Sequence, residues 1–201
     1  MKIFKIYMGV FFMLLAMSAF ANDFNSDEFS KTYNTVMQQD KNEMYKAIAI
    51  LDKALQKDPM SPQILMYKGS ILAKIADKDF FFWDKLAHVN KGIDLMAKAM
   101  DILDSKAGES VSEEDKERMY VIHGITSALI PAAFKQEPVA VMELKKAINH
   151  KYFNNVDAEY QAQCYGLLSK LYRKRGEKDK AEAMLQKGMR IDPKIAEMNA
   201  K

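Results

Sequence analysis

The sequence predicts an all-α protein whose helices follow one another as short antiparallel pairs. Apolar residues recur at helical spacing through most of residues 25–193. The 201 residues include only 8 Gly and 5 Pro, which is too few for a turn-rich β chain. No two-residue hairpin signal of the Asn-Gly type separates the apolar stretches, so strands are not expected.

Residues 1–21 are expected to be a cleaved signal peptide. Lys2 and Lys5 precede an uncharged stretch from Ile6 to Phe20, and Ala19-Phe20-Ala21 has the small-x-small form of a signal-peptidase site. This run of 15 residues is shorter than the roughly 20 that a membrane-spanning helix needs. The mature protein would then be periplasmic or secreted. The alternative is a retained N-terminal anchor, although the absence of a cysteine after the run excludes one of the lipoprotein type.

Capping and stop signals divide the remaining chain into eight expected helices. Ser112 with Asp115 resembles a capping box, as does Asn25 with Glu28, and Ser61-Pro62 places proline at a first helical position. The connections between helices are short, which favours antiparallel neighbours. The expected helices span residues 26–39, 43–57, 62–77, 82–104, 113–130, 138–150, 157–175 and 178–191.

The last two of these helices carry a spaced set of large and small residues. Small residues at Ala181 and Gly188 would let the second helix lie close to the first, while Gly176 permits a tight turn between them and Pro193 ends the second helix. The spacings along the set are 3, 4, 4, 5, 4, 3 and 5 residues, over Tyr165, Leu168, Tyr172, Gly176, Ala181, Leu185, Gly188 and Pro193. This set resembles the tetratricopeptide repeat, a helix pair of 34 residues.

The resemblance implies a single repeat domain over residues 22–201, folded as a right-handed superhelix of about four helix pairs. It is strongest in residues 162–195 and partial elsewhere, and the second unit has a lengthened helix. The alternative is an unrelated helical bundle, because amphipathic helices share this apolar spacing by default. The implied units are residues 25–59, 62–104, 113–152 and 159–193.

In this family the first helix of each unit lines a concave wall that holds the ligand. By analogy, the expected partner-binding residues are Gln63, Met66, Ser70, Arg118, Val121, Lys170 and Arg173. This small, apolar and basic set suits a protein or peptide segment that carries carboxylates. The sequence lacks the asparagines of the family's chaperone-tail clamp, so that ligand is not implied. The alternative is a solvated basic face that binds nothing.

A run of aromatic residues interrupts the second unit. Phe80, Phe81, Phe82 and Trp83 are consecutive, so on a helix they would point in nearly all directions. One interpretation is that they pack a lengthened helix against both of its neighbours. The other is an exposed aromatic patch for a partner, which Phe134, after the break at Pro131, is expected to join.

No catalytic or metal-binding set is expected. The three histidines stand on separate helices, and none has another histidine at i+3 or i+4; His123 is expected to be a hydrogen-bonded core or interface residue. The lone Cys164 is expected to be buried as a small apolar residue. A net charge of +3, reduced to +1 by removal of Lys2 and Lys5, does not favour nucleic-acid binding.

These observations predict a non-catalytic scaffold of the bacterial envelope, without cofactors or stable membrane insertion, that docks a protein or peptide segment of an envelope complex. The alternative is an accessory subunit of an envelope transporter, or a carrier of a small apolar ligand held near Trp83.

Overall fold

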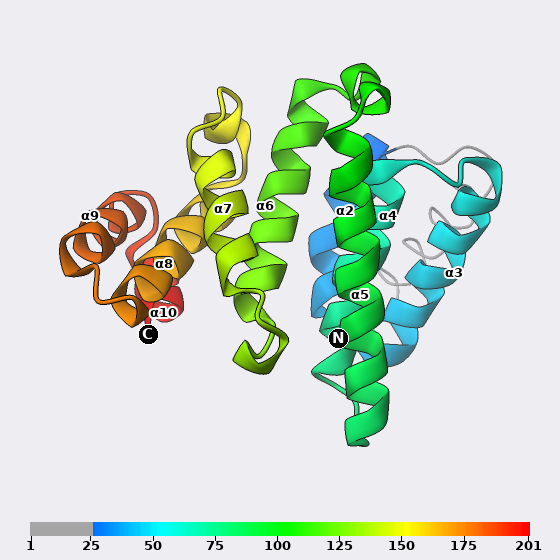
Figure 1. Ribbon diagram of the computed structural model, residues 1–201, viewed down its shortest axis with the longest axis horizontal. Helices are drawn as coiled ribbons and strands as arrows, with labels where there is room; N and C mark the ends of the chain where they lie inside the picture. Colours follow the sequence, from blue (N-terminus) through cyan, green and yellow to red (C-terminus); the bar gives the residue numbers. More distant parts are fainter. Residues whose placement is uncertain (1–25) are drawn as a thin grey trace, which may run out of the picture. The chain divides into compact units, whose positions relative to one another are not determined.

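A computed structural model describes residues 26–201, and within that range it contains nine α-helices, three short 3₁₀ helices and no strand (Figure 1). The all-α prediction is therefore confirmed. The expected signal peptide and the expected capping residue Asn25 lie outside the described residues.

Each of the eight expected helices is present, with ends within two residues of those predicted. The α-helices are α2 (Ser26–Gln38), α3 (Lys41–Lys57), α4 (Pro62–Ala76), α5 (Phe82–Leu103), α6 (Glu113–Leu129), α7 (Glu137–Ile148), α8 (Ala158–Lys174), α9 (Lys178–Met189) and α10 (Pro193–Ala200). The 3₁₀ helices are η1 (Lys106–Ser110), η2 (Ala132–Phe134) and η3 (Phe153–Asn155).

Several local signals act as the sequence predicts. The Ser112 hydroxyl accepts a hydrogen bond of 3.1 Å from the Asp115 N–H at the start of α6. Gly176 has φ +75°, a left-handed conformation that suits glycine in the turn between α8 and α9. After Pro131 the chain forms only the short η2, so the predicted termination of α6 in this segment is also confirmed.

The expectation that Pro193 ends a helix is wrong, because Pro193 is the first residue of the additional helix α10. Proline is tolerated there because the N–H that it lacks has no partner within a helix. The preceding residue, Asp192, caps α10 by accepting a hydrogen bond of 3.0 Å from the Ile195 N–H.

The described chain divides into two compact units, and the boundary along the sequence falls between Met100 and Asp101, within the last turn of α5. In the first unit, α4 is buried on nearly all sides. Its Ser70 hydroxyl accepts a hydrogen bond of 2.8 Å from the Tyr33 hydroxyl on α2. Helices α4 and α5 come closest at Gly69 and Gly92, where a Cβ atom on either glycine would lie 2.7 Å from the carbonyl oxygen of the other.

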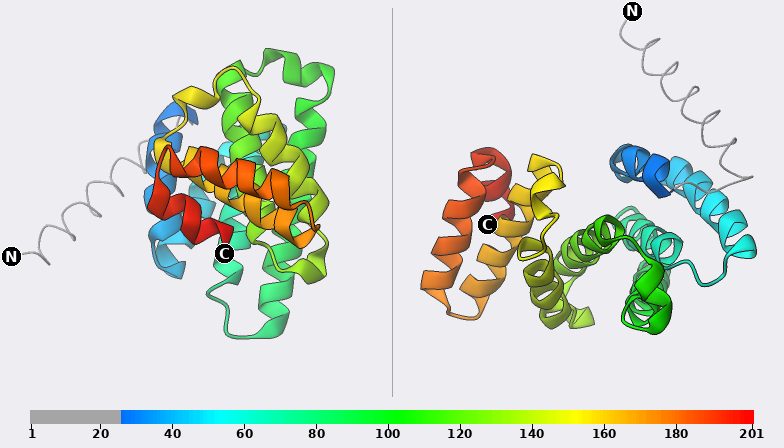
Figure 2. Two further views of the ribbon diagram at one scale, coloured as in Figure 1. Left: turned by 90° about the vertical axis from the view of Figure 1, so that its left-hand side faces the viewer. Right: turned by 90° about the horizontal axis from the view of Figure 1, so that it is seen from above.

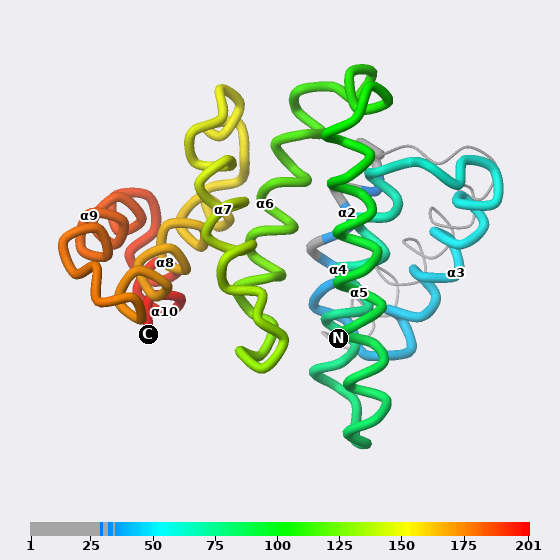
Figure 3. Tube along the Cα trace, viewed as in Figure 1, coloured from blue at the N-terminus to red at the C-terminus, as the bar shows by residue number. Residues whose placement is uncertain are grey.

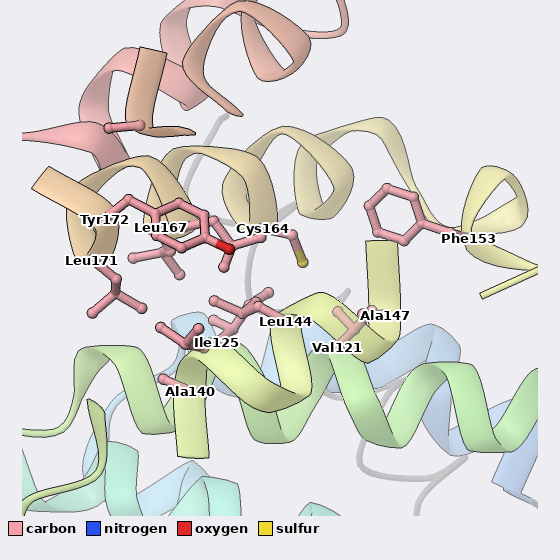
Figure 4. Packing of buried hydrophobic residues seen from close by; sticks show 13 residues of the cluster. Val121, Ile125, Ala140, Leu144, Ala147, Phe153, Cys164, Leu167, Leu171 and Tyr172 are labelled. Atoms are coloured by element: carbon pink, nitrogen blue, oxygen red, sulfur yellow. The ribbon is translucent and has the colours of Figure 1, made fainter. Parts of the chain in front are cut away.

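The second unit is centred on apolar residues of α6, α7 and α8. Figure 4 shows Leu144, Leu167 and the thiol of Cys164 directed toward one another in this core, and all three are buried. The prediction for Cys164 is therefore confirmed. Ala181 is buried and Gly188 lies against Tyr165 and Ala162, as the small-residue pattern predicts.

Candidate functional site

The most exposed apolar feature of the first unit is the turn between α4 and α5. Phe80, Phe81, Phe82 and Trp83 are 92%, 64%, 66% and 75% exposed, and we call these four residues the aromatic turn. The sequence left open whether these rings pack a lengthened helix against its neighbours or form an exposed patch, and the structure shows an exposed patch. Within the first unit, the turn projects beyond the ends of α2 and α3 (Figures 1 and 2).

The exposure follows from the position of these residues at the start of a helix. Successive residues of an α-helix are rotated by about 100°, so four consecutive rings cannot share one buried face. The rings instead contact each other edge to face, with centroid separations of 5.2 Å for Phe80 and Phe81 and 5.4 Å for Phe82 and Trp83. Such pairs reduce the apolar area in contact with water but leave most of it accessible.

Asp79, the residue before the aromatic turn, links the turn to α3 and α5. The side chain of Asp79 is fully buried. One of its oxygens accepts a hydrogen bond of 2.5 Å from Lys41 Nζ at the start of α3, and the other lies 2.7 Å from His88 Nδ1 on α5. On the other side of the ring, His88 Nε2 lies 3.1 Å from the Tyr45 hydroxyl. We call these four residues the Asp79 anchor.

The electrostatics of the Asp79 anchor favour a permanently ionised carboxylate. Burial by itself would raise the pKa of Asp79, but the hydrogen bonds from Lys41 and His88 outweigh burial and hold the pKa below its ordinary value. In return, the hydrogen bond to Asp79 raises the pKa of Lys41. With a proton on Nδ1, the His88 ring can donate to Asp79 while its Nε2 atom faces the Tyr45 hydroxyl.

This arrangement can present large apolar rings in a fixed orientation. Burying an exposed aromatic side chain against a partner stabilises a complex by roughly 1.5–3 kcal/mol before the costs of association. Aromatic anchors of this kind dominate many protein interfaces. The aromatic turn itself consists of three phenylalanines and one tryptophan, whose side chains offer apolar surface to a partner.

Three of the seven residues expected on a concave wall are inaccessible. Met66 and Ser70 are fully buried, and Val121 is part of the core of the second unit. The expectation that these side chains face a ligand is therefore wrong. Ser70 is unavailable to a ligand because its hydroxyl accepts a hydrogen bond from the Tyr33 hydroxyl on α2.

The remaining four wall residues keep some exposed surface, and the chain already engages three of them. Arg118 donates to Asp115 at 3.2 Å, and Gln63 accepts a long hydrogen bond of 3.4 Å from the Ser61 hydroxyl. Arg173 donates to the carbonyl oxygen of Ala200 at 3.2 Å, while Lys170 is half-buried.

Helix α10 covers part of the face of α8 that was expected to receive a ligand. The carbonyl oxygen of Ala196 lies 2.6 Å from where a Cβ of Gly166 would be, which shows how closely the two helices approach. In the tube view α8, α9 and α10 are neighbours (Figure 3). The C-terminal helix of the chain thus takes the place predicted for a partner.

Phe134, the other aromatic residue expected in the patch, is half-buried in η2. It belongs to the second unit, whereas the aromatic turn belongs to the first. Its participation in a common patch stays a prediction.

Sequence reasoning missed two buried acids of the second unit, Glu117 and Glu143, whereas it placed a third buried ionisable residue, His123, in the core or at an interface. Glu117, His123 and Glu143 are each at least 95% buried, and the His123 Nδ1 atom has no hydrogen-bond partner among the described residues. The expectation of a hydrogen-bonded His123 is therefore wrong for this atom. No signal in the sequence distinguishes Glu117 and Glu143 from surface acids, because amphipathic helices carry many such charges.

Within residues 26–201, no three His, Cys, Asp or Glu side chains gather in a group suited to a metal ion. None of the helices in that range combines the length and the apolar character required to traverse a bilayer. Comparisons of the chain with profiles of known families, with curated proteins and with solved structures found no match. The function proposed for the chain therefore rests on its residues and their geometry.

Proposed function

We propose that this protein is a non-catalytic scaffold of the bacterial envelope that holds a protein segment against the aromatic turn. The observation that carries this proposal is the exposure of four consecutive aromatic side chains next to a buried, doubly paired carboxylate. A monomeric protein rarely exposes so much contiguous apolar surface without a binding role. The expected signal peptide of residues 1–21 supports the envelope as the location.

A repeat-like arrangement of helix pairs is part of the same proposal. The close approach of α9 to α8 at Gly188, and the left-handed turn at Gly176, are features that the tetratricopeptide resemblance implies. Stacked pairs of this kind would form a right-handed superhelix that serves as a frame for binding. Within the first unit, the partly exposed Gln63 is proposed as a secondary polar contact, and within the second unit Arg118, Lys170 and Arg173 are proposed as separate contacts for carboxylates of a partner.

The geometry of the aromatic turn favours a macromolecular partner over a small apolar ligand. A small-molecule site normally encloses most of its ligand. The rings of the aromatic turn instead stand in solvent, and the least exposed of them, Phe81, is still 64% exposed. A partner with an apolar groove can receive such rings as anchors, in the way that interface hot spots are received.

Site-specific photo-crosslinking in cells tests this function. Phe81 is replaced by the photoreactive benzoylphenylalanine, and Leu129 in the second unit, which is 57% exposed, is replaced in a parallel variant. We expect a discrete adduct with a second protein from position 81 and not from position 129. Mass spectrometry of the adduct identifies the partner.

Two outcomes would overturn the proposal. Adducts of identical composition from both positions would show non-specific contact. An adduct that contains lipid alone at position 81 would assign the aromatic turn to a membrane surface instead of a protein.

A further inference from the structure

Glu117 is an acidic residue in the interior of the second unit. It lies near the start of α6, and only 1% of its surface is exposed. Glu117 also acts on Cys164 of α8, whose thiol pKa is raised first by burial and then by the Glu117 carboxyl. An ionised carboxylate in such surroundings is costly unless a partner compensates its charge.

The partner is a histidine in the connection between α7 and α8. His150 follows the end of α7 by two residues, and its Nδ1 atom lies 2.8 Å from Oε2 of Glu117. The imidazole is flanked by the rings of Tyr120 on α6 and Tyr152, with centroid separations of 5.9 Å and 6.0 Å. The contact therefore joins α6 to the chain segment that leads into α8.

The opposite side of the imidazole meets a surface carboxylate. His150 Nε2 lies 3.5 Å from Oε2 of Glu113, on the first turn of α6. Glu113 in turn accepts a hydrogen bond of 2.7 Å from Lys116 and lies 3.7 Å from Lys151. The charged and titratable groups around Glu117 and His150 are thus Glu113, Lys116, Lys151, Tyr120, Tyr152 and Cys164.

The geometry indicates where the proton between Glu117 and His150 resides. The backbone N–H of Tyr152 points at His150 Nδ1 from 3.4 Å, so this nitrogen acts as an acceptor. A carboxylate oxygen at 2.8 Å from an acceptor nitrogen is favourable only if the carboxyl carries the proton. Burial acts in the same direction, since it raises the pKa of Glu117 to about 8.

We propose that Glu117 and His150 form a proton-linked latch, in which protonated Glu117 donates to His150 and holds the α7–α8 connection on α6. Loss of the proton leaves a buried carboxylate opposite the Nδ1 lone pair. A shift of the ring proton from Nε2 to Nδ1 would instead turn the Nε2 lone pair toward the Glu113 carboxylate and remove the acceptor of the Tyr152 N–H, so the connection loosens in either tautomer. The latch lies in the second unit and does not depend on the function proposed for the aromatic turn.

The direction of the pH effect follows from linkage. The folded chain binds the Glu117 proton more tightly than the unfolded chain does, so this group favours folding most at low pH. Its contribution falls as the pH rises from the ordinary pKa of a glutamic acid toward 8, and above 8 the native connection itself opens. The connection between α7 and α8 is therefore expected to become less stable at alkaline pH.

Amide hydrogen exchange of the full chain tests the latch. Wild type is compared with Glu117→Gln, which mimics the protonated acid, and with Glu114→Gln, an exposed control on the same helix. Above pH 8, exchange in residues 150–157 should accelerate in wild type relative to Glu117→Gln by up to about tenfold per pH unit. Glu114→Gln should follow wild type. A ratio between wild type and Glu117→Gln that stays constant from pH 6 to pH 9 would overturn the proposal.

A second measurement uses the wild-type chain, so it does not depend on whether a variant at position 117 folds. The side-chain carboxyl carbon of Glu117 in the wild-type chain, labelled with ¹³C, reports its protonation by NMR. Titration of this carbon near pH 8 is expected. Titration below pH 5 would show that the carboxyl is ionised at neutral pH and that the latch does not exist.

Discussion

His123 on α6 is buried, and its Nδ1 atom lacks a hydrogen-bond partner among residues 26–201. Burial, with a smaller contribution from the positive charge of Lys146, lowers the pKa of His123 to about 4. The unfolded chain therefore takes up a proton at a higher pH than the folded chain does. Stability from the neutral imidazole is complete above pH 6.5 and is lost as the pH falls toward 4.

Replacement of His123 by leucine should reduce the loss of unfolding free energy that occurs as the pH falls from 6.5 toward 4. From the difference in pKa, wild type should lose about 3 kcal/mol of unfolding free energy between pH 7 and pH 4 because of this one residue. Urea titrations at several pH values measure the loss, with Glu114→Gln as a control on the exposed side of α6. An equal loss in wild type and His123→Leu would contradict the assignment.

Gly69 illustrates a different constraint at the residue scale. A Cβ at this position would lie 2.7 Å from the Gly92 carbonyl oxygen and 2.7 Å from Cγ of Met96. Because the first of these atoms belongs to the backbone, it cannot move aside without displacing α5. We expect Gly69→Ala to lower the unfolding free energy by about 1–3 kcal/mol.

Chemical denaturation measures the effect of Gly69→Ala. Ala87→Ser, at an exposed position of α5, is the control and should change stability by no more than about 0.5 kcal/mol. Equal unfolding free energies for Gly69→Ala and Ala87→Ser would contradict the close approach of α4 and α5 at Gly69.

At the scale of single elements, the Asp79 anchor determines how the aromatic turn is presented. Asp79→Asn removes the charge that Lys41 and His88 share but preserves the size of the side chain. We expect a loss of about 1–3 kcal/mol in stability, as for other hydrogen bonds to charged groups. The fluorescence anisotropy of Trp83, the only tryptophan in the chain, should also fall as the turn becomes more mobile.

Asp77→Asn is the matched control for the Asp79 anchor. Asp77 is exposed in the same turn, and its carboxylate pairs with Lys74 at 3.2 Å. It should leave both the stability and the anisotropy of Trp83 nearly unchanged. Equal effects of the two substitutions would show that the anchor does not hold the turn.

Helix positions could be predicted from the sequence, because apolar spacing and caps are local signals. The same local reasoning located Gly176 in a tight turn between two helices, and Ala181 and Gly188 at a close helix contact. It failed for α10, since Asp192-Pro193 both follows α9 and begins another helix. An Asp-Pro pair can follow the end of one helix or begin the next, and the two residues are the same in both cases.

The candidate site could be predicted only in part. Four consecutive aromatic residues exceed what one helix face can bury, and that excess was visible in the sequence. The Asp79 anchor was not, because Lys41, Asp79 and His88 are separated by 38 and 9 positions and meet only in the folded chain. The wall residues Met66 and Ser70 were misplaced because the family analogy did not account for the apolar side of α2, where Phe29, Tyr33 and Val36 are buried.

At the scale of the whole molecule, the proposed location in the envelope depends on processing of the N-terminal segment. If residues 1–21 are removed at the predicted site, mass spectrometry of the protein recovered from the envelope fraction should find Asn22 as its first residue. Recovery of a chain that still begins with Met1 would contradict cleavage and support a retained anchor.

The measurement that tests the central proposal most directly is ¹⁹F NMR of the full chain labelled with 5-fluorotryptophan. Because Trp83 is the only tryptophan, the label reports the environment of the aromatic turn through a single residue. Addition of detergent-solubilised envelope proteins should shift or broaden this resonance, whereas vesicles made from the extracted envelope lipids alone should leave it unchanged. An unaltered resonance with the proteins, or the same change with the lipid vesicles, would contradict the binding of a protein segment at the aromatic turn.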